Sequence, residues 1–195
     1  MNRIIVPPHI RGLIFDCDGT LVDSMPLHMQ AWKETFSKFD TYYDEEFLFS
    51  LKGMKEKEIV SIYNERFGTA LDPTVTVHAK QTLMKERLHL VKPINLIVNI
   101  ARQFYKKLPL GVASGSARDI VTEELKIVGI LGLFDAVVTA DDVIKPKPEP
   151  DIFLEAAKRI YVEPEFCQVF EDGDPGLIAA EKAGMIAMDV RPFLI

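Results

Sequence analysis

The sequence has few cysteines, no block of basic residues and no long apolar run. Its two cysteines, Cys17 and Cys167, both lie in apolar, strand-like segments, so we expect them to stay buried thiols in a reducing compartment. A net charge of -6, with no cluster of lysine and arginine, argues against a nucleic-acid-binding surface. No apolar stretch approaches the roughly 20 residues that a spanning helix needs, and the segment Met1–Pro8 is shorter than a signal peptide. We therefore expect a cytoplasmic protein that contacts neither membrane nor nucleic acid.

The segment Gly12–Asp23 joins an apolar strand to a group of carboxylates. Leu13–Phe15 is an unbroken apolar run of the kind found in a central parallel strand that is covered on both faces. Asp16 and Asp18 follow it, at the end of the strand where open α/β sheets bind their ligands. The segment therefore predicts a buried strand that carries a functional site at its carboxyl end.

Between this strand and the next, the sequence has helical patterns and no strand pattern. We predict helices at 24–39, about 44–51, 55–67 and 73–90, with Ser24 as the N-cap of the first. Because a direct crossover between parallel strands needs only one helix, four helices indicate an insertion. We therefore predict a helical cap domain at 24–90 and an α/β core domain at 1–23 and 91–195.

After Pro93 the pattern changes to alternating strands and helices. Strands are predicted at 109–113, 134–139, 167–170 and 185–190, and helices at 95–107, 118–128, 151–160 and 174–183, the last with Asp174 as its N-cap. Such alternation predicts an α/β fold with a doubly wound parallel sheet.

Polar side chains lie at the predicted strand ends. They are Asp16 and Asp18, Ser114, Lys147 in the loop after the third strand, and Glu171 and Asp172. Taken alone, each is more common as part of a turn, a helix cap or an exposed loop, but together they place carboxylates, a hydroxyl and an ammonium at one edge of the sheet. This set suits phosphoryl transfer. The carboxylates would repel a phosphate unless a cation lay among them, so we predict Mg²⁺ as the cofactor.

The carboxylates have distinct predicted roles. Asp16 attacks phosphorus as the nucleophile, and Asp18 protonates the leaving oxygen and later deprotonates water, while its backbone carbonyl binds the metal. Asp172 completes the metal site with Asp16. Glu171 holds a metal-bound water or orients the ligands.

The predicted phosphate site uses smaller groups as well. Ser114 and Lys147 bind the phosphate oxygens, with Thr20 nearby. Gly19 lets the chain turn away tightly, and Gly115 allows a close backbone approach.

Two side chains of the predicted cap are candidates for the same site. His28 is placed to help position Asp18 or substrate when the cap closes, and Lys52 to touch the substrate. The alternatives are an ordinary cap-helix histidine and a solvated lysine.

Four segments resemble the successive motifs of the haloacid dehalogenase superfamily: Asp16-x-Asp18-Gly-Thr-Leu-x-Asp, Ser114-Gly-Ser, Lys147-Pro-x-Pro-Asp and Glu171-Asp172. The helical insertion, His28-x-x-Ala31-Trp32 and Ala179-Ala180-x-x-Ala183-Gly184 are similar to its β-phosphoglucomutase-like branch. The resemblance implies a Rossmann-like sheet of order 5-4-1-2-3, with Asp16 and Asp172 on neighbouring strands, and an aspartyl-phosphate intermediate. It also favours Lys147 over Lys145, because only Lys147 has the family's spacing to Asp151.

The resemblance leaves open which reaction the chain performs. A mutase must hold a second phosphate, and the branch places an arginine for this shortly after Leu-Lys-Gly, where this chain has Glu56. Thr20 and Gly115 resemble the small bacterial fructose-1-phosphatase-like members. We therefore expect a monomeric, Mg²⁺-dependent phosphatase that acts on a small phosphorylated metabolite such as a sugar phosphate. The alternatives are a β-phosphoglucomutase and a non-catalytic binding protein on the same fold.

Overall fold

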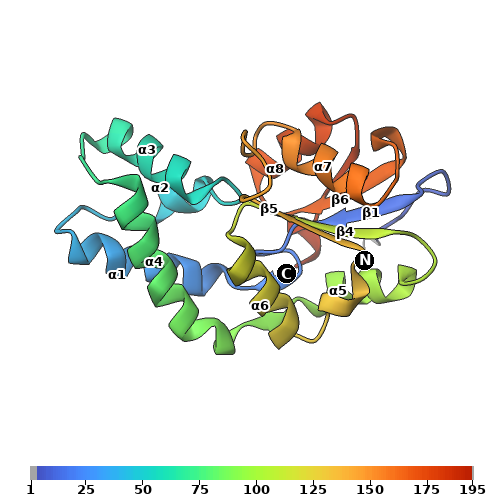
Figure 1. Cartoon of the computed structure of the whole chain (residues 1–195), viewed down its shortest axis with the longest axis horizontal. Helices are drawn as coiled ribbons and strands as arrows, with labels where there is room; N and C mark the ends of the chain where they lie inside the picture. Colours follow the sequence, from blue (N-terminus) through green and yellow to red (C-terminus); the bar gives the residue numbers. More distant parts are fainter. Residues whose placement is uncertain (1–3, 195) are drawn as a thin grey trace.

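The computed structural model describes residues 4–194 of the chain (Figure 1). Met1–Arg3, part of the segment compared with a signal peptide, and Ile195 lie outside the described residues, although the predicted core domain includes them.

A five-stranded parallel sheet forms the centre of one half of the molecule. Its strands are β1 (Gly12–Phe15), β4 (Leu110–Ser114), β5 (Ala136–Thr139), β6 (Cys167–Glu171) and β7 (Ile186–Asp189). They lie in the order β5-β4-β1-β6-β7, and every neighbouring pair is parallel. Counted from β7 along the sheet, this is the predicted order 5-4-1-2-3. The predicted fold class is therefore confirmed.

Helices cover both faces of this sheet, which explains why β1 is apolar throughout. Leu13 and Phe15 face one layer of the core and Ile14 the other, as the alternation of a strand requires. One face is covered by α5 (Asn95–Phe104) and α6 (Arg118–Ile127), and the other by α7 (Asp151–Arg159) and α8 (Asp174–Lys182) (Figure 1). Phe15 also stacks on Phe170 of β6, with 4.7 Å between the ring centroids. Burial of these side chains holds the carboxyl ends of β1 and β6 side by side.

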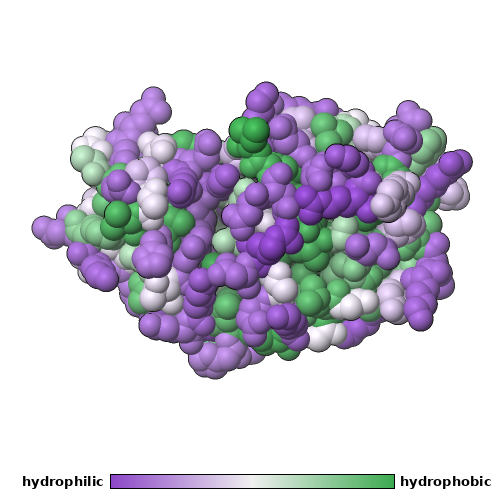
Figure 2. All heavy atoms as spheres, viewed as in Figure 1, coloured by the Kyte–Doolittle hydropathy of each residue, from purple (hydrophilic) through white to green (hydrophobic). Residues whose placement is uncertain are grey.

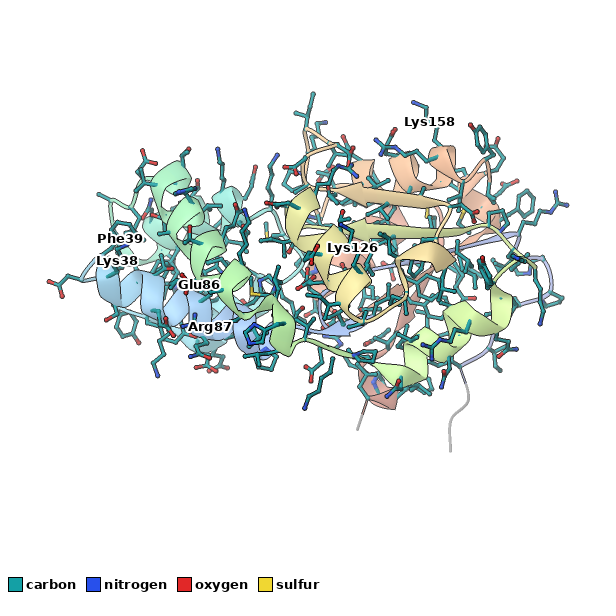
Figure 3. The ribbon with its side chains drawn as sticks, turned by 60° about the horizontal axis from the view of Figure 1, so that its bottom comes forward. Lys38, Phe39, Glu86, Arg87, Lys126 and Lys158 are labelled. Carbon is teal, nitrogen blue, oxygen red and sulfur yellow. The ribbon has the colours of Figure 1, made fainter. Side chains whose placement is uncertain are left out.

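Four helices pack together beside the sheet and form the other half of the molecule (Figure 1). They are α1 (Met25–Lys38), α2 (Glu45–Ser50), α3 (Glu56–Phe67) and α4 (Pro73–Arg87). Their apolar faces enclose a separate cluster that includes Trp32, Phe36 and Tyr63. At the end of α4, Arg87 lies close to α1 and pairs with Glu34 at 2.9 Å (Figure 3). We call these helices and the loops between them the cap; its domain boundaries stay a prediction.

Two short strands connect the cap to the sheet. β2 (Val22–Asp23) and β3 (Lys92–Pro93) pair in antiparallel fashion, Val22 with Pro93 and Asp23 with Lys92. The sequence did not predict them, because strands of two residues carry no periodicity. They bring the entry and exit of the cap together, beside the carboxyl end of β1.

The structure corrects two details of the predicted helix caps. Gly173, and not Asp174, is the N-cap of α8, and Asp174 is its first helical residue. Ser24 is at the N-cap position of α1, but its hydroxyl donates to Asp18 Oδ1 at 2.6 Å instead of bonding the helix backbone.

Candidate active site

The tips of β1 and β6 bring three carboxylates and one ammonium into contact. Asp16 directly follows β1, Glu171 ends β6, and Asp172 comes next; each is at most 5% exposed. The Lys147 ammonium is 1% exposed and lies 2.8 Å from Asp16 Oδ1 and 2.7 Å from Glu171 Oε2. It also donates to the backbone carbonyl of Ala113 at 3.2 Å. Lys145 is exposed, so the structure brings Lys147 and not Lys145 to Asp16.

Buried groups of opposite charge lie in direct contact at this point of the sheet. Burial and the neighbouring charge of Glu171 raise the pKa of Asp16 well above its usual value, and Lys147 only partly offsets them. Burial lowers the pKa of Lys147, but Asp16 and Glu171 outweigh burial and raise it above its usual value. Burial and Glu171 raise the pKa of Asp172 as well. The strand tips therefore hold more negative charge than their lysine balances.

The donor set at the strand tips fits a hard divalent cation. Asp16, Glu171 and Asp172 each offer a carboxylate oxygen, and these oxygens lie within 4.8 Å of one another. Oxygen donors with excess negative charge are what Mg²⁺ prefers. Glu171 is already bonded at both oxygens, because Oε1 accepts the backbone N–H groups of Asp172 and Gly173 while Oε2 accepts Lys147. Asp16 is bonded by a side chain only at Oδ1, to Lys147, so among the three carboxylates it has the more available oxygen.

A lysine of the cap reaches across to Asp172. Lys52, in the loop between α2 and α3, donates from Nζ to Asp172 Oδ2 at 2.6 Å. Thr20 donates its hydroxyl to Asp172 Oδ1 at 3.2 Å, so this predicted phosphate-site residue contacts the carboxylate here. Gly19 has a φ of +84°, and a Cβ there would overlap Asp172 Oδ2. Glycine is therefore required for the turn to pass Asp172.

Asp18 is held by four donors from three parts of the chain. Oδ1 accepts the Ser24 hydroxyl at 2.6 Å and His28 Nε2 at 3.0 Å, and Oδ2 accepts the hydroxyls of Ser114 at 3.1 Å and Ser116 at 2.8 Å. Burial raises the pKa of Asp18, but His28 and the hydroxyl hydrogen bonds outweigh burial and hold it well below its usual value. Asp18 is therefore ionised, and both oxygens act as acceptors.

A second group of possible ligands includes Asp18 itself, but this group does not fit a metal ion. Ligand atoms of Asp18, His28 and Glu124 approach one another within 4.8 Å. Lys80 Nζ, however, lies 2.5 Å from His28 Nδ1. Because an ammonium can only donate, Nδ1 is an acceptor, and Nε2 carries the hydrogen that points to Asp18. His28 therefore has no free lone pair for a metal.

Glu124 is a buried carboxyl group on α6 in this second group. It accepts the Cys17 thiol at Oε2, at 3.7 Å, and its Oε1 has no hydrogen-bond partner among the described residues. Burial and the charge of Asp18 raise the pKa of Glu124 well above its usual value. Burial, followed by the charge of Glu124, also raises the pKa of Cys17, which is a buried free thiol as expected.

The structure thus brings all the predicted site residues to one end of the sheet, but several contacts were not predicted. Gly115 directly faces the cap, because a Cβ there would overlap the Gly53 carbonyl oxygen. The sequence analysis missed Ser116, Lys80 and Glu124 as neighbours of the site. Ser116 could have been found from its place in Ser-Gly-Ser after β4, whereas the lysine and glutamate follow ordinary helical patterns and carry no such signal.

The chain resembles known proteins over nearly its whole length. The family model of haloacid dehalogenase-like hydrolases matches residues 13–190. The fructose-1-phosphate phosphatase YqaB of Escherichia coli (strain K12) is 39% identical, over 92% of this chain and 96% of that protein. The β-phosphoglucomutase of Bacillus subtilis (strain 168) is 32% identical, over 93% and 83%. A crystal structure of a hydrolase from Pseudomonas syringae covers 92% of this chain and 84% of its own, with a TM-score of 0.86 and 24% identity.

These matches and the strand-tip site define the class of the protein. The chain belongs to the haloacid dehalogenase-like hydrolase family. Over residues 4–194, no helix has the length and apolar character needed to cross a membrane. Hydrophilic side chains cover most of the face seen in Figure 2, with apolar side chains gathered in smaller patches.

Proposed function

We propose that the protein is a Mg²⁺-dependent phosphatase that hydrolyses a small sugar phosphate through a phosphorylated Asp16. The observation that carries this proposal is the pairing of the buried Asp16 with Lys147 at 2.8 Å. Lys147 occupies Oδ1, which leaves Oδ2 for attack on phosphorus. The ammonium also supplies positive charge for the phosphate oxygens, as a buried cation beside the nucleophile can.

The proposed reaction has two steps, both of which use Asp16 and Asp18. In the first, an oxygen of Asp16 bonds to phosphorus, the bond from phosphorus to the sugar oxygen breaks, and Asp18 gives that oxygen a proton. In the second, Asp18 takes a proton from water, whose oxygen displaces Asp16 and releases inorganic phosphate. Asp18 is ionised without substrate, and the like charge of a bound phosphate would raise its pKa so that it can carry the proton.

The other polar groups bind and position the phosphate. Ser114, now on Asp18, would turn to a phosphate oxygen when substrate enters. Mg²⁺, held by Asp16, Asp172 and the Asp18 carbonyl with Glu171 orienting them, would offset the negative charge that gathers around phosphorus. Thr20 and Lys52 would assist through Asp172.

Similarity to relatives supports a sugar phosphate as the substrate. The E. coli relative that is 39% identical is a fructose-1-phosphate phosphatase, and a relative from Thermotoga maritima, 29% identical, is a phosphorylated carbohydrates phosphatase. We propose that this chain acts on a substrate of the same kind, as a cytoplasmic monomer.

A mutase is the second candidate, because the B. subtilis β-phosphoglucomutase is 32% identical. The resemblance places an arginine for the second phosphate where this chain has Glu56. Glu56 is buried and pairs with Lys80 and Gln81. A carboxylate that is paired with Lys80 offers no positive charge to a second phosphate, so hydrolysis is favoured. A non-catalytic binding protein is disfavoured, because binding alone does not require both Asp16 and Asp18 in this environment.

The test is an assay of inorganic phosphate and glucose 6-phosphate together, with Mg²⁺ and with EDTA. The panel contains fructose 1-phosphate, related sugar phosphates, and β-glucose 1-phosphate with a catalytic amount of bisphosphate. We expect phosphate release from at least one sugar phosphate, stopped by EDTA. Rapid formation of glucose 6-phosphate with little free phosphate would show a mutase, and no turnover on the whole panel would reject both enzymes.

A further inference from the structure

The pocket above Asp18 has an apolar lining on its cap side. It encloses about 40 Å³ between the cap and the strand tips, which is room for a few water molecules, and Asp18 and Ser116 lie at its core side. Six apolar side chains line it from the cap: Met25, Met29, Trp32, Leu48, Met54 and Ile59. The leaving group of a phosphate ester bound at Asp16 would face these side chains. Charge on that group would be poorly solvated there.

Glu56 contributes a carboxylate to the lining of this pocket, and it neutralises the charge of the buried Lys80. Glu56 is 7% exposed and lies at the start of α3. Lys80 of α4 is fully buried and donates from Nζ to Glu56 Oε1. Gln81 donates to Glu56 Oε2 at 2.7 Å, so both carboxylate oxygens are bonded. The pair links α3 to α4 and has no net charge.

The remaining contacts of the Lys80 ammonium are with His28 and Trp32. Nζ lies 2.5 Å from His28 Nδ1 and 5.5 Å from the centre of the Trp32 ring. Lys52, which also lines the pocket, is paired with Asp172 at 2.6 Å and lies over the Phe49 ring. Lys80 and Lys52 therefore each already have a carboxylate partner.

We propose that Glu56 selects substrates whose leaving group is uncharged. This inference rests on the proposed phosphatase function and names its substrate class: phosphate monoesters of small neutral polyols and sugars. A leaving group with a second phosphate or a carboxylate would be desolvated against the apolar lining, and Glu56, by pairing with Lys80, withholds the cation that could compensate its charge. Specificity then comes from the cost of burying the charged leaving group without a partner.

The test compares esters that differ in the charge of the leaving group. Two pairs suffice: glycerol 3-phosphate against 3-phosphoglycerate, and fructose 1-phosphate against fructose 1,6-bisphosphate. We expect kcat/KM to favour the uncharged member by at least about tenfold, because a charged leaving group would lose its solvation against the apolar lining while Lys80 is already paired with Glu56. In Glu56→Gln, Lys80 keeps its charge without a carboxylate partner, so the preference should fall at least about fivefold.

Glu58→Gln is the matched control, because Glu58 is exposed on the same helix and carries the same charge. Its preference should equal that of the wild type. The ratio of the kcat/KM values for two substrates does not depend on the amount of folded enzyme. A thermal melt of each variant identifies any loss of fold. A wild type that prefers the charged esters, or a folded Glu56→Gln with an unchanged ratio, overturns the role of Glu56. Absence of turnover on every ester rejects the proposed phosphatase itself.

Discussion

The strand tips and the cap both bury charged side chains at the site, but they balance the charges differently. At the strand tips, Asp16 and Glu171 share Lys147 while Asp172 pairs with Lys52 of the cap, and the pKa values of Asp16 and Asp172 are raised. In the cap, Lys80 and Glu56 form a pair without net charge.

The two charge distributions suit two different tasks in the proposed reaction. Excess negative charge at the strand tips creates a place for a cation and, with it, for a phosphate. A balanced pair beside apolar side chains leaves no attraction for a second anion, so the cap can choose among leaving groups without disturbing the phosphate site.

Removal of the nucleophile should have the largest effect. Asp16→Asn keeps the size of the side chain and can still accept from Lys147, but a neutral amide does not form an acyl phosphate. We expect kcat to fall at least about 10³-fold, in the range seen when a covalent nucleophile is lost. Phosphate release measures the loss, and circular dichroism checks that the fold is intact. Activity near that of the wild type would show that another residue is the nucleophile.

Lys147→Ala should reduce both activity and stability. It removes the cation next to the nucleophile, so we expect kcat/KM to fall about 10²-fold. It also leaves buried carboxylates without their partner, which should lower the free energy of unfolding by about 3 kcal/mol. Kinetics and urea denaturation measure the two effects. Lys145→Ala is the control, since its side chain is exposed, and a larger loss in that variant would mean that the wrong lysine was assigned.

Gly115→Ala tests whether the cap must approach the strand tips closely. An added Cβ would overlap the Gly53 carbonyl oxygen, so the loop that carries Lys52 must move. We expect kcat/KM to fall about tenfold, because small displacements of positioning groups slow reactions, with little change in melting temperature. Gly132→Ala is the matched control, since its Cβ would meet no atom within 4 Å. Equal kinetics for the two variants would contradict a role for this contact.

Asp142→Asn tests charges at the edge of the sheet, outside the site. Burial raises the pKa of Asp142, but the Thr139 N–H, Arg159 and Arg118 outweigh burial and hold it below its usual value. The ionised group therefore adds stability above the usual aspartate pKa of about 4 and loses it as the pH falls through its lowered value. We expect the variant to lose about 1 kcal/mol at neutral pH and little at pH 3. Denaturation at both pH values measures this, and a pH-independent loss would reject the ionic explanation.

The strand-tip half of the site could be predicted from the sequence because its residues follow strand ends. Parallel strands end at the same edge, so Asp16, Ser114 and Asp172 had to lie close together once the sheet was recognised. Lys147 followed only from its spacing to Asp151 in the family motif. Contact between Thr20 and Asp172 was not predictable, because it depends on how the turn at Gly19 is placed.

The cap half was less predictable, because its contacts depend on how four helices pack. Lys80 follows the pattern of an ordinary polar helix position, yet it is fully buried between His28 and Glu56. Glu56 was noticed only because the family resemblance places an arginine there, and its partner could not be named. Helical periodicity shows which face is buried but not which charged side chains meet across it.

The most direct test of the central claim is to trap the phosphorylated enzyme. Enzyme with Mg²⁺ and excess sugar phosphate is quenched rapidly in acid, and its peptides are analysed by mass spectrometry. We predict one phosphate on the peptide that contains Asp16, removed by hydroxylamine as an acyl phosphate would be, and absent from Asp16→Asn. Rapid turnover with the phosphate on another residue, or with none on the enzyme at any quench time, would contradict the account.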